Sequence, residues 1–360
     1  MTISADVAVI GAGVFGAWTA EFLRRAGARV TLYDAYGAAH SRSSSGGETR
    51  IIRTAYARDE IYTRMAVESL AEWRAFQQRS GNRILLETGV LLMGRATDTR
   101  LVESAETLTR TGVRFEDLNA KEMRLRYPQI SLAEDGRGIL EIEAGALMAR
   151  RAVQEMVSDM DLRLERVTPE LKAGICVYAC GPWLPTLFPD VIGPRMFPSR
   201  QEIFFFGRPA GDTQFVPPAM PVFTDSANFY GMPDIENRGF KIGRDEHGPA
   251  INPDTDNRLT TTGELALVRS HLALRFPALA NAPVVETRVC QYENTSNGDF
   301  LIDRHPERDN VWFVGGGSGH GFKHGPAVGR YAAEMISGSG KPEPRFSLAS
   351  KAVVQHRQVY

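Results

Sequence analysis

The sequence has few cysteines and no long apolar run. Its three cysteines, Cys176, Cys180 and Cys290, are odd in number and widely spaced, which predicts no disulfide framework. No stretch approaches the roughly 20 apolar residues that a membrane-spanning helix requires. The Cys/His spacings of zinc sites and the Gly-x-Ser-x-Gly turn of many hydrolases are also missing. We therefore expect no metal site and no membrane partner.

Charge and the start of the chain do not indicate nucleic-acid binding or secretion. The formal net charge of -1 gives no excess that would attract a nucleic acid or an acidic membrane. The first apolar run begins at Val7 with no cationic region before it and leads directly into Gly11, which is typical of a strand rather than a signal peptide. We expect a cytoplasmic protein, and its 360 residues suffice for about two domains.

A dinucleotide-binding pattern follows this first run. Residues 7–10, 17–26 and 29–33 are predicted to form a strand, a helix and a strand, as in a Rossmann-like βαβ unit. Between the first two lies Gly11-x-Gly13-x-x-Gly16, whose glycines permit a tight turn and the close approach of a pyrophosphate. Asp34 ends the second strand, at a spacing typical of the acid that binds a ribose hydroxyl and repels a 2′-phosphate. A second glycine-rich segment, residues 315–323, suggests that a distant part of the chain returns to the same cofactor.

The middle of the chain is rich in predicted strands. Helices are expected from Asp59 to the glycine at 81, after a capping box of Asn119 and Glu122, at 144–157 and at 264–276. Strands are expected at 84–94, 175–179, 201–207, 239–243, 284–292 and 300–303, and a last βα unit at 311–314 and from about 326. Many strands without alternating helices indicate an antiparallel sheet in a second domain. We predict an α/β (α+β) fold, with a Rossmann-like domain (1–80, 145–195 and 285–345) and an inserted antiparallel-sheet substrate domain (81–144 and 196–284).

Several polar residues leave more than one interpretation open. Residues 37–49 are polar and rich in glycine and serine, and we favour an ordered anion-binding loop over a flexible linker. Arg50 and Arg53 share an apolar segment, so a buried guanidinium there needs an anion. A substrate carboxylate and a salt bridge to Glu48 or Asp59 are equally good solutions. Lys241 lies in a predicted strand, where most lysines face solvent.

Several motifs, taken in chain order, resemble those of a known family. Gly47-Glu-Thr-Arg-Ile-Ile-Arg53, Tyr230-Gly-x-Pro233, Gly239-x-Lys241, Cys290-x-Tyr292, Phe300-Leu-Ile-Asp303 and Gly319-His-Gly-Phe-Lys323 occur in this order. With the first glycine turn, they make the chain similar to the flavin-dependent amine oxidases of the D-amino-acid-oxidase (DAO) group, of the sarcosine oxidase and N-methyltryptophan oxidase type. The resemblance implies that the Rossmann-like domain binds FAD and that a small amino acid is oxidised at its C–N bond. Dioxygen would then be reduced to hydrogen peroxide, and a monomer is expected.

The resemblance also implies roles for individual residues. Cys290 matches the covalent anchor of the flavin, Lys241 the lysine that activates dioxygen, and Arg50 a cation close to the flavin. Arg53 and Lys323 match the pair that binds the substrate carboxylate, and Tyr230 and Tyr292 match active-site tyrosines. The expected cofactor-binding residues are Gly11, Gly13, Val14, Phe15, Gly16, Asp34, Ser44, Ser45, Thr49, Arg50, Gly181, Trp183, Cys290, Gly317, Gly319, His320, Gly321, Phe322 and Lys323.

Three departures from the family pattern bear on the substrate. Asp245 and Gly46 stand where sarcosine oxidases have histidine, and the stretch between Asp161 and Ile175 is short. The short stretch either exposes part of the adenosine site or is harmless. Two alternatives to an oxidase are a D-amino-acid or pipecolate-type flavin dehydrogenase that passes electrons to a carrier, and a flavin-binding protein without turnover.

Overall fold

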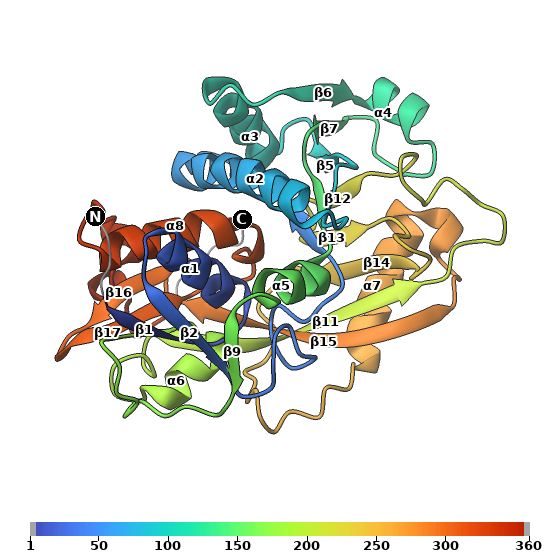
Figure 1. Cartoon of the computed structure of the whole chain (residues 1–360). Coiled ribbons are helices and arrows are strands. Elements are labelled where there is room, and N and C mark those ends of the chain that lie inside the picture. The colour runs from blue at the N-terminus through green and yellow to red at the C-terminus, as the bar shows by residue number, and fades with distance from the viewer. Residues whose placement is uncertain (1–4, 356–360) are drawn as a thin grey trace.

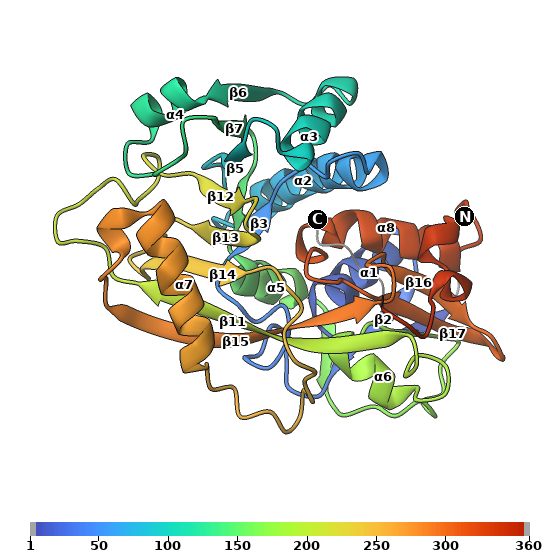
Figure 2. The same ribbon diagram turned by 180° about the vertical axis from the view of Figure 1, so that it is seen from behind.

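Two large sheets share the chain in the computed structural model, which describes residues 5–355 (Figure 1). One sheet has six strands and the other has eight, and a small three-stranded sheet completes the described part of the structure. Helices cover one face of the six-stranded sheet, and the eight-stranded sheet extends away from it. Figure 2 shows the same arrangement from behind, with α7 (Thr262–Arg275) lying across the eight-stranded sheet.

The six-stranded sheet is the Rossmann-like unit that the sequence predicts. Five of its strands are parallel, and only the edge strand β16 is antiparallel to its neighbour. In spatial order the strands are β16 (Leu301–His305), β17 (Arg308–Gly315), β10 (Ile175–Tyr178), β1 (Asp6–Ile10), β2 (Arg29–Asp34) and β9 (Asp161–Leu164). Because β1, β10 and β17 run parallel to one another, their carboxyl ends meet at one edge, where ligands of such sheets bind, although β10 and β17 come from distant parts of the chain.

Four helices pack together on one face of this sheet, and a short one lies on the other. The first group is α1 (Val14–Arg25), α2 (Glu60–Ser80), α5 (Ala149–Val157) and α8 (Gly325–Ile336). The short helix is α6 (Leu184–Leu187), which follows the 3₁₀ turn η1 (Gly181–Trp183) on the opposite side in Figure 1. The aromatic rings of Trp18 and Trp73, from α1 and α2, lie edge to face in the core between these helices.

The eight-stranded sheet is antiparallel except at one pair. Its order is β15 (Val284–Thr295), β11 (Met196–Phe206), β14 (Phe240–Arg244), β13 (Phe229–Met232), β12 (Val222–Asp225), β5 (Val90–Arg95), β7 (Gly136–Glu141) and β6 (Phe115–Asn119). β12 and β5 run parallel to each other, so the prediction of an antiparallel sheet is wrong for this one pair. The pair joins two segments far apart in sequence, so no hairpin turn dictates their relative direction.

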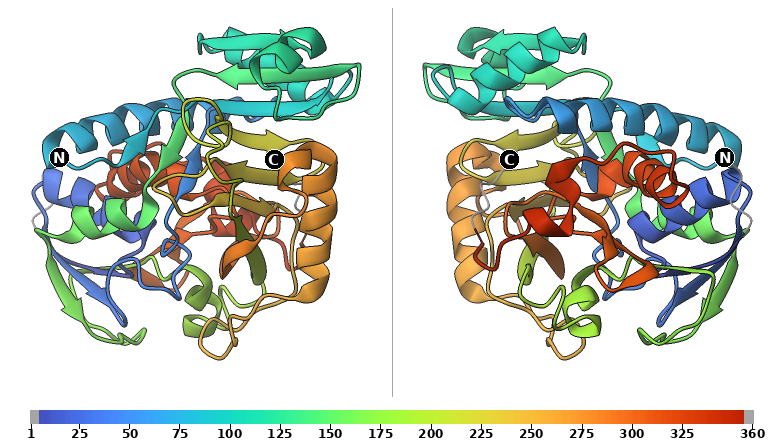
Figure 3. Two further views of the ribbon diagram at one scale, coloured as in Figure 1. Left: turned by 90° about the vertical axis from the view of Figure 1, so that its right-hand side faces the viewer. Right: turned by 90° about the vertical axis from the view of Figure 1, so that its left-hand side faces the viewer.

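The remaining elements cover the outer end of this sheet. Figure 3 shows α3 (Thr99–Arg110), α4 (Ala120–Arg126) and β6 as a layer above α2. The capping box at the start of α4 is confirmed, because Asn119 accepts from the amide of Glu122, whose carboxylate accepts from the amide of Asn119. Three further 3₁₀ turns lie near the C-terminus, η3 (Phe322–His324), η4 (Pro344–Phe346) and η5 (Leu348–Ser350), and η2 (Pro277–Leu279) follows α7.

The helix predicted at residues 144–157 begins later in the structure than expected. Residues 145–147 form the strand β8 (Gly145–Leu147), which pairs with β3 (Arg50–Ile52) and β4 (Leu85–Leu86), and α5 starts only at Ala149. A Cβ atom at Gly145 would lie 1.9 Å from the carbonyl oxygen of Leu86, so strand pairing here requires glycine. The apolar residues just before α5 are therefore buried as part of a paired strand and not as part of the helix.

The division into domains stays a prediction. β15, whose residues 285–295 the sequence assigns to the first domain, pairs along its length with β11 in the eight-stranded sheet. Its carboxyl end nevertheless reaches the six-stranded sheet, because the carboxylate of Glu293 accepts a hydrogen bond from the amide of Gly317, just after β17. A side chain of this strand is therefore bonded to the loop that follows β17 of the six-stranded sheet.

The contact between α1 and α8 depends on a glycine and provides a test of the fold. A Cβ atom at Gly329 would lie 2.5 Å from the backbone carbon of Trp18. We expect Gly329→Ala to lower the free energy of unfolding by roughly 1–3 kcal/mol, because the two helices must separate. In the matched control Gly263→Ala, in the exposed first turn of α7, a Cβ atom meets nothing within 4 Å, so no loss is expected. Thermal unfolding followed by circular dichroism measures both, and equal midpoints for the two variants would contradict this packing account.

Candidate functional site

The turn after β1 is built from glycines that leave no room for side chains. Gly11 has φ +109°, and a Cβ atom there would lie 2.4 Å from the carbonyl oxygen of Ala179. A Cβ atom at Gly16 would lie 1.8 Å from the carbonyl oxygen of Gly11. The turn thus brings the N-terminus of α1, with its amide groups, to the carboxyl edge of the six-stranded sheet.

Side chains from two loops hold this turn in place. Asp34 Oδ2 accepts a hydrogen bond of 2.8 Å from the amide of Ala12. Ser45 Oγ accepts one of 3.0 Å from the amide of Val14, the first residue of α1. Backbone and arginine hydrogen bonds, such as that from Arg150 Nε to the carbonyl oxygen of Gly46 (3.0 Å), fix the loop of residues 37–49. The loop is ordered, as the sequence analysis favours, and its anion-binding role stays a prediction.

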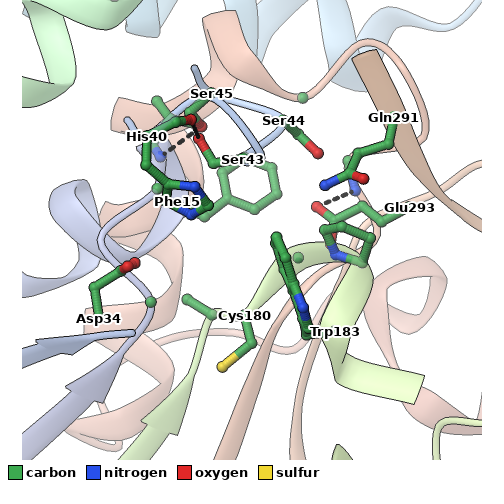
Figure 4. Close-up of a pocket in the computed structure, with 18 of the residues that line it drawn as sticks. Phe15, Asp34, His40, Ser43, Ser44, Ser45, Cys180, Trp183, Gln291 and Glu293 are labelled. Carbon is green, nitrogen blue, oxygen red and sulfur yellow. Dashed lines mark hydrogen bonds between the residues drawn. The ribbon is translucent and has the colours of Figure 1, made fainter. Parts of the chain in front are cut away.

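A large cavity opens at this edge of the sheet (Figure 4). The empty space at this site, including the open solvent at its mouth, is about 1190 Å³, and its wall comes from the glycine turn, the loop after β2, η1, the segment after β17 and β15. The expected site residues that line it are Gly11, Gly13, Val14, Phe15, Asp34, Ser44, Ser45, Arg50, Gly181, Trp183, Cys290, Tyr292, Gly317, Gly319, Gly321 and Phe322. Segments far apart in the sequence therefore meet at one cavity.

Four residues expected to bind the cofactor lie outside this lining. Gly16 packs under the glycine turn, and the carbonyl oxygen of Thr49 accepts from Lys241. His320 lies in an aromatic cluster, stacked on Phe300. Lys323 is turned toward the carbonyl oxygen of His320, 2.9 Å from its Nζ atom. Their contribution to cofactor binding stays a prediction.

Arg50 connects the loop before β3 with β15. Its Nη2 atom donates to the carbonyl oxygen of Ser44 (2.7 Å) and to the sulfur of Cys290 (3.2 Å), and its Nη1 atom donates to the carbonyl oxygen of Thr49 (2.9 Å). Arg50 and Cys290 line both the large cavity and a second one of about 350 Å³. A guanidinium and a thiol therefore stand side by side where the two cavities meet.

Lys241 lies in the second cavity and is buried, which the strand position alone did not predict. Its Nζ atom donates to the carbonyl oxygen (2.8 Å) and the hydroxyl (3.2 Å) of Thr49, and only 3% of the residue is exposed. Burial, followed by the charge of Arg50, lowers the pKa of Lys241 to about 7. This lysine can therefore exchange its proton near neutral pH.

Two further cations, Arg53 and Lys323, lie close to the aromatic ring of Tyr56. The guanidinium carbon of Arg53 lies 4.6 Å from the centre of the Tyr56 ring, and Nζ of Lys323 lies 5.0 Å from it. Both cations are buried. Burial, and next the charge of Arg53, lowers the pKa of Lys323 well below its usual range. From the sequence, Glu48 and Asp59 are candidate salt-bridge partners of Arg53. In the structure Glu48 forms a salt bridge with Arg288, among other arginines, and Asp59 forms one with Arg345.

The backbone after Arg53 is held by a buried glutamate that the sequence did not single out. Glu141, at the end of β7, accepts hydrogen bonds from the amides of Thr54 (2.6 Å) and Ala55 (3.1 Å). Burial raises the pKa of Glu141, and these hydrogen bonds oppose the shift. The eight-stranded sheet thereby fixes the segment that carries Arg53.

Two tyrosines and an aspartate form the other side of this region. Tyr230 lies close enough to Tyr292 for that residue to influence its pKa, and the hydroxyl of Tyr292 donates to Asp245 Oδ1 at 3.3 Å. Burial raises the pKa of Tyr230. Asp245 lies within electrostatic range of Lys323, so the aspartate that replaces the expected histidine adds a negative charge near the two cations.

Arg100 is a residue near this site that sequence reasoning missed. Burial, and next the charge of Arg53, lowers the pKa of Arg100 to about 10, whereas Asp245 acts in the opposite direction. The local sequence shows only the helix start, where Asp98 accepts from the amide of Arg100. Its position near Arg53 follows from the packing of α3, which no local pattern reveals.

The short stretch after Asp161 closes one end of the large cavity. β9 adds a strand beside β2, and Glu165, Arg166 and Val167 line the cavity. Arg166 also binds Asp254, which accepts a hydrogen bond of 3.0 Å from Trp183 Nε1. The trimmed stretch still contributes to the wall of this end.

Residues 5–355 contain no cluster of three or more His, Cys, Asp or Glu side chains arranged to hold a metal ion. Over the same residues, no helix has both the length and the apolar character needed to cross a membrane.

Comparisons with known proteins agree with this architecture. Human peroxisomal sarcosine oxidase is 30% identical over 372 residues, which cover 96% of this chain and 94% of that protein. Monomeric sarcosine oxidase from Bacillus sp. (strain B-0618) is 29% identical, with 97% and 96% covered. N-methyl-L-tryptophan oxidase from Salmonella newport (strain SL254) is 28% identical, with 95% and 96% covered.

Solved structures share the fold. A modified fructosyl peptide oxidase from Aspergillus nidulans superposes with a TM-score of 0.82 at 15% identity, covering 96% of this chain and 94% of that chain. NikD, described as an unusual amino acid oxidase essential for nikkomycin biosynthesis, superposes with a TM-score of 0.76 at 19% identity, with 98% and 99% covered. The sequence model of the DAO family, described as FAD dependent oxidoreductase, matches residues 6–335. The chain therefore belongs to the DAO family and is an FAD-dependent oxidoreductase.

Proposed function

We propose that the protein is an amine oxidase that oxidises the C–N bond of a small N-alkyl, cyclic or other amino acid and reduces dioxygen to hydrogen peroxide. The observation that carries this proposal is the pair of buried cations, Arg53 and Lys323, which lie 4.6 Å and 5.0 Å from the centre of the Tyr56 ring. Two cations in a site of low polarity favour a bound anion strongly, and an amino acid supplies one as its carboxylate. The sarcosine and N-methyl-L-tryptophan oxidases among the relatives support this substrate class.

The large cavity fits FAD. Gly11 and Gly16 permit the tight turn in its wall, where side chains would clash with backbone atoms, and α1 begins beside the cavity, where its N-terminus favours a pyrophosphate. Asp34, at the end of β2, lines the cavity and is proposed to accept a hydrogen bond from a ribose hydroxyl. When bound, FAD supplies the two-electron oxidation of the substrate and the return of those electrons to dioxygen.

The protein's own residues bind and orient the substrate. Arg53 offers two parallel N–H groups to a carboxylate, and Glu141 fixes the backbone that carries it. A substrate carboxylate beside Lys323 restores the charge that burial disfavours. The hydroxyls of Tyr230 and Tyr292 border the same region, and that of Tyr230 stays protonated at neutral pH, because burial raises the pKa of Tyr230.

Two other functions use the same fold. A dehydrogenase that passes electrons to a carrier would form little hydrogen peroxide in air, and a flavin-binding protein without turnover would not be reduced by any amino acid. The buried, titratable Lys241 favours the oxidase, because a cation in a dry cavity stabilises the negative charge that dioxygen gains. We also propose that the enzyme is a monomer and that it acts in the cytoplasm.

If Arg53 binds the carboxylate, its removal affects only substrates that have one. We expect Arg53→Gln to lower kcat/KM for an N-methyl amino acid by roughly 10- to 100-fold, because a charge-assisted contact in a buried site is lost. The corresponding amine without a carboxylate should be oxidised equally slowly by both proteins. Arg58→Gln, which removes an exposed arginine five residues further on, is the matched control and should leave kcat/KM unchanged. An equal loss for both substrates would contradict the assignment.

If Lys241 assists dioxygen, its removal affects only one half of the reaction. In stopped-flow measurements we expect Lys241→Met to slow reoxidation of the flavin by roughly 100-fold or more, and to leave anaerobic reduction by substrate nearly intact. The wild-type reoxidation rate should fall as the pH rises through about 7, because Lys241 then loses its proton. Lys121→Met, at an exposed position of α4, is the control. Losses of the same size in both half-reactions would argue against this role.

We propose that Cys290 forms a thioether to the 8α-methyl carbon of the flavin. The C–S bond would replace the S–H bond and one C–H bond of the methyl group, with loss of two protons, and the two electrons released would pass through the flavin to dioxygen. Its sulfur lies 3.2 Å from Arg50 Nη2, so a cation stands beside the nucleophile. Wild-type protein should therefore stay yellow after acid precipitation, and Cys290→Ser should release its flavin. Cys180→Ser is a close control, because Cys180 lines the same cavity and its pKa is raised by burial. Free flavin in the supernatant of precipitated wild-type protein would exclude the bond.

A further inference from the structure

Glu293 is a buried carboxylate in the wall of the large cavity, and only half of it is satisfied. The residue lies near the end of β15 and is 8% exposed. Oε1 accepts a hydrogen bond of 3.1 Å from the amide of Gly317. Oε2 has no hydrogen-bond partner among the residues that the structure describes. Figure 4 shows the Glu293 side chain at the cavity, with the bond to Gly317 dashed.

The surroundings of Glu293 contain no side chain that donates to Oε2. A Cβ atom built on Gly181 would lie 3.5 Å from Oε2, and one on Gly315 would lie 3.4 Å from it. One on Gly317 would lie 3.1 Å from Oε1, so three glycines surround the carboxylate. The amide of Gly316 also faces the carboxylate, yet Oε2 is left without a hydrogen bond.

A carboxylate in this situation requires a donor. Burial raises the pKa of Glu293 to about 7, against the effect of the two backbone amides. A buried polar group without a partner is costly, and it is more costly still when it carries a charge. Since the carboxylate lines the cavity in which the cofactor belongs, a group on the cofactor is the natural donor.

The position of Glu293 selects one part of FAD. In Figure 4 it lies across the cavity from Asp34, the residue placed for the adenosine ribose. Cys290, placed for the flavin ring, is three residues earlier on β15, which is about 10 Å along a strand. The pyrophosphate is excluded as a partner, because two anions repel each other. The ribityl chain lies between the ring and the pyrophosphate, and its hydroxyl groups are hydrogen-bond donors.

We propose that Glu293 is a cofactor-positioning residue whose carboxylate accepts a hydrogen bond from a ribityl hydroxyl of FAD. The contact fixes the middle of the cofactor, between the anchors at its two ends. Sequence reasoning did not find this residue, because a glutamate next to Tyr292 in a strand is usually exposed to solvent.

The test measures binding of FAD and uses no substrate, so it is independent of the proposed oxidase activity. Cys290→Ser protein freed of flavin serves as the background, so that binding is reversible whether or not the thioether forms. Into this background we place Glu293→Gln, which keeps an acceptor oxygen and the shape of the side chain, and Glu293→Leu, which keeps neither oxygen. Gln291→Leu, at a neighbouring position that also lines the cavity, is the control. Flavin fluorescence reports the dissociation constant for FAD and for analogues that each lack one ribityl hydroxyl.

We expect Glu293→Leu to weaken FAD binding by roughly 10-fold or more, and Glu293→Gln to weaken it less. The analogue that lacks the hydroxyl bound by Glu293 should bind about 10-fold more weakly than FAD to the protein with Glu293. The same analogue should bind Glu293→Leu no more weakly than FAD binds it. Gln291→Leu should keep the full difference between FAD and that analogue. Two results would overturn the proposal. One is that each analogue binds more weakly than FAD by the same factor in the protein with Glu293, in Glu293→Gln and in Glu293→Leu. The other is that Glu293→Gln binds FAD more tightly than the protein with Glu293 does.

Discussion

The guanidinium of Arg50 is the interaction on which the arrangement of the site depends. It binds the sulfur of Cys290 in β15 and the carbonyl oxygens of Ser44 and Thr49 in the loop before β3. It therefore joins the N-terminal loop, which covers the glycine turn, to the eight-stranded sheet. Its charge also contributes to the lowered pKa of Lys241, since two buried cations disfavour each other. One side chain thus sets both the shape and the electrostatics at the meeting point of the two cavities.

Buried cations dominate the region where a substrate is proposed to bind. Arg53, Arg100 and Lys323 influence one another's charge, and burial lowers the pKa of both Lys323 and Arg100. Asp245 opposes these positive charges in both cases. A concentration of positive charge in a site of low polarity favours a bound anion, which gives a physical reason for the proposed preference for a carboxylate. Asp245 makes the region less positive than a histidine would.

Much of this fold follows from local sequence rules. The turn that begins at Gly11 joins β1 to α1 as predicted, because side chains at Gly11 and at Gly16, in the first turn of α1, would clash with backbone atoms. The capping box at Asn119 and the left-handed Gly81 after α2 are also local, and the structure confirms both elements. The parallel pairing of β12 with β5 and the strand β8 were not predicted, because they depend on contacts between distant segments.

The candidate site divides in the same way. Motif residues such as Arg53, Lys241 and Cys290 could be named from the resemblance to a family, yet burial of Lys241 became visible only in three dimensions. Arg100 and Glu293 belong to no motif, and Glu141 is a single residue in an ordinary strand. Each became noticeable because of the groups packed around it. Local patterns therefore predict where the chain turns, while the charge balance of the site depends on tertiary packing.

The central claim, that the cation pair at Tyr56 selects a small amino acid for oxidation by FAD, is tested most directly by anaerobic flavin bleaching. The purified holoenzyme is mixed without oxygen with N-methyl, cyclic and D-amino acids and with their decarboxylated counterparts, and the flavin absorbance near its visible maximum is followed. At least one amino acid should bleach the flavin much faster than its decarboxylated counterpart, and admission of air should restore the colour with formation of hydrogen peroxide. A flavin that no amino acid bleaches, or that is bleached equally well without a carboxylate, would contradict the claim.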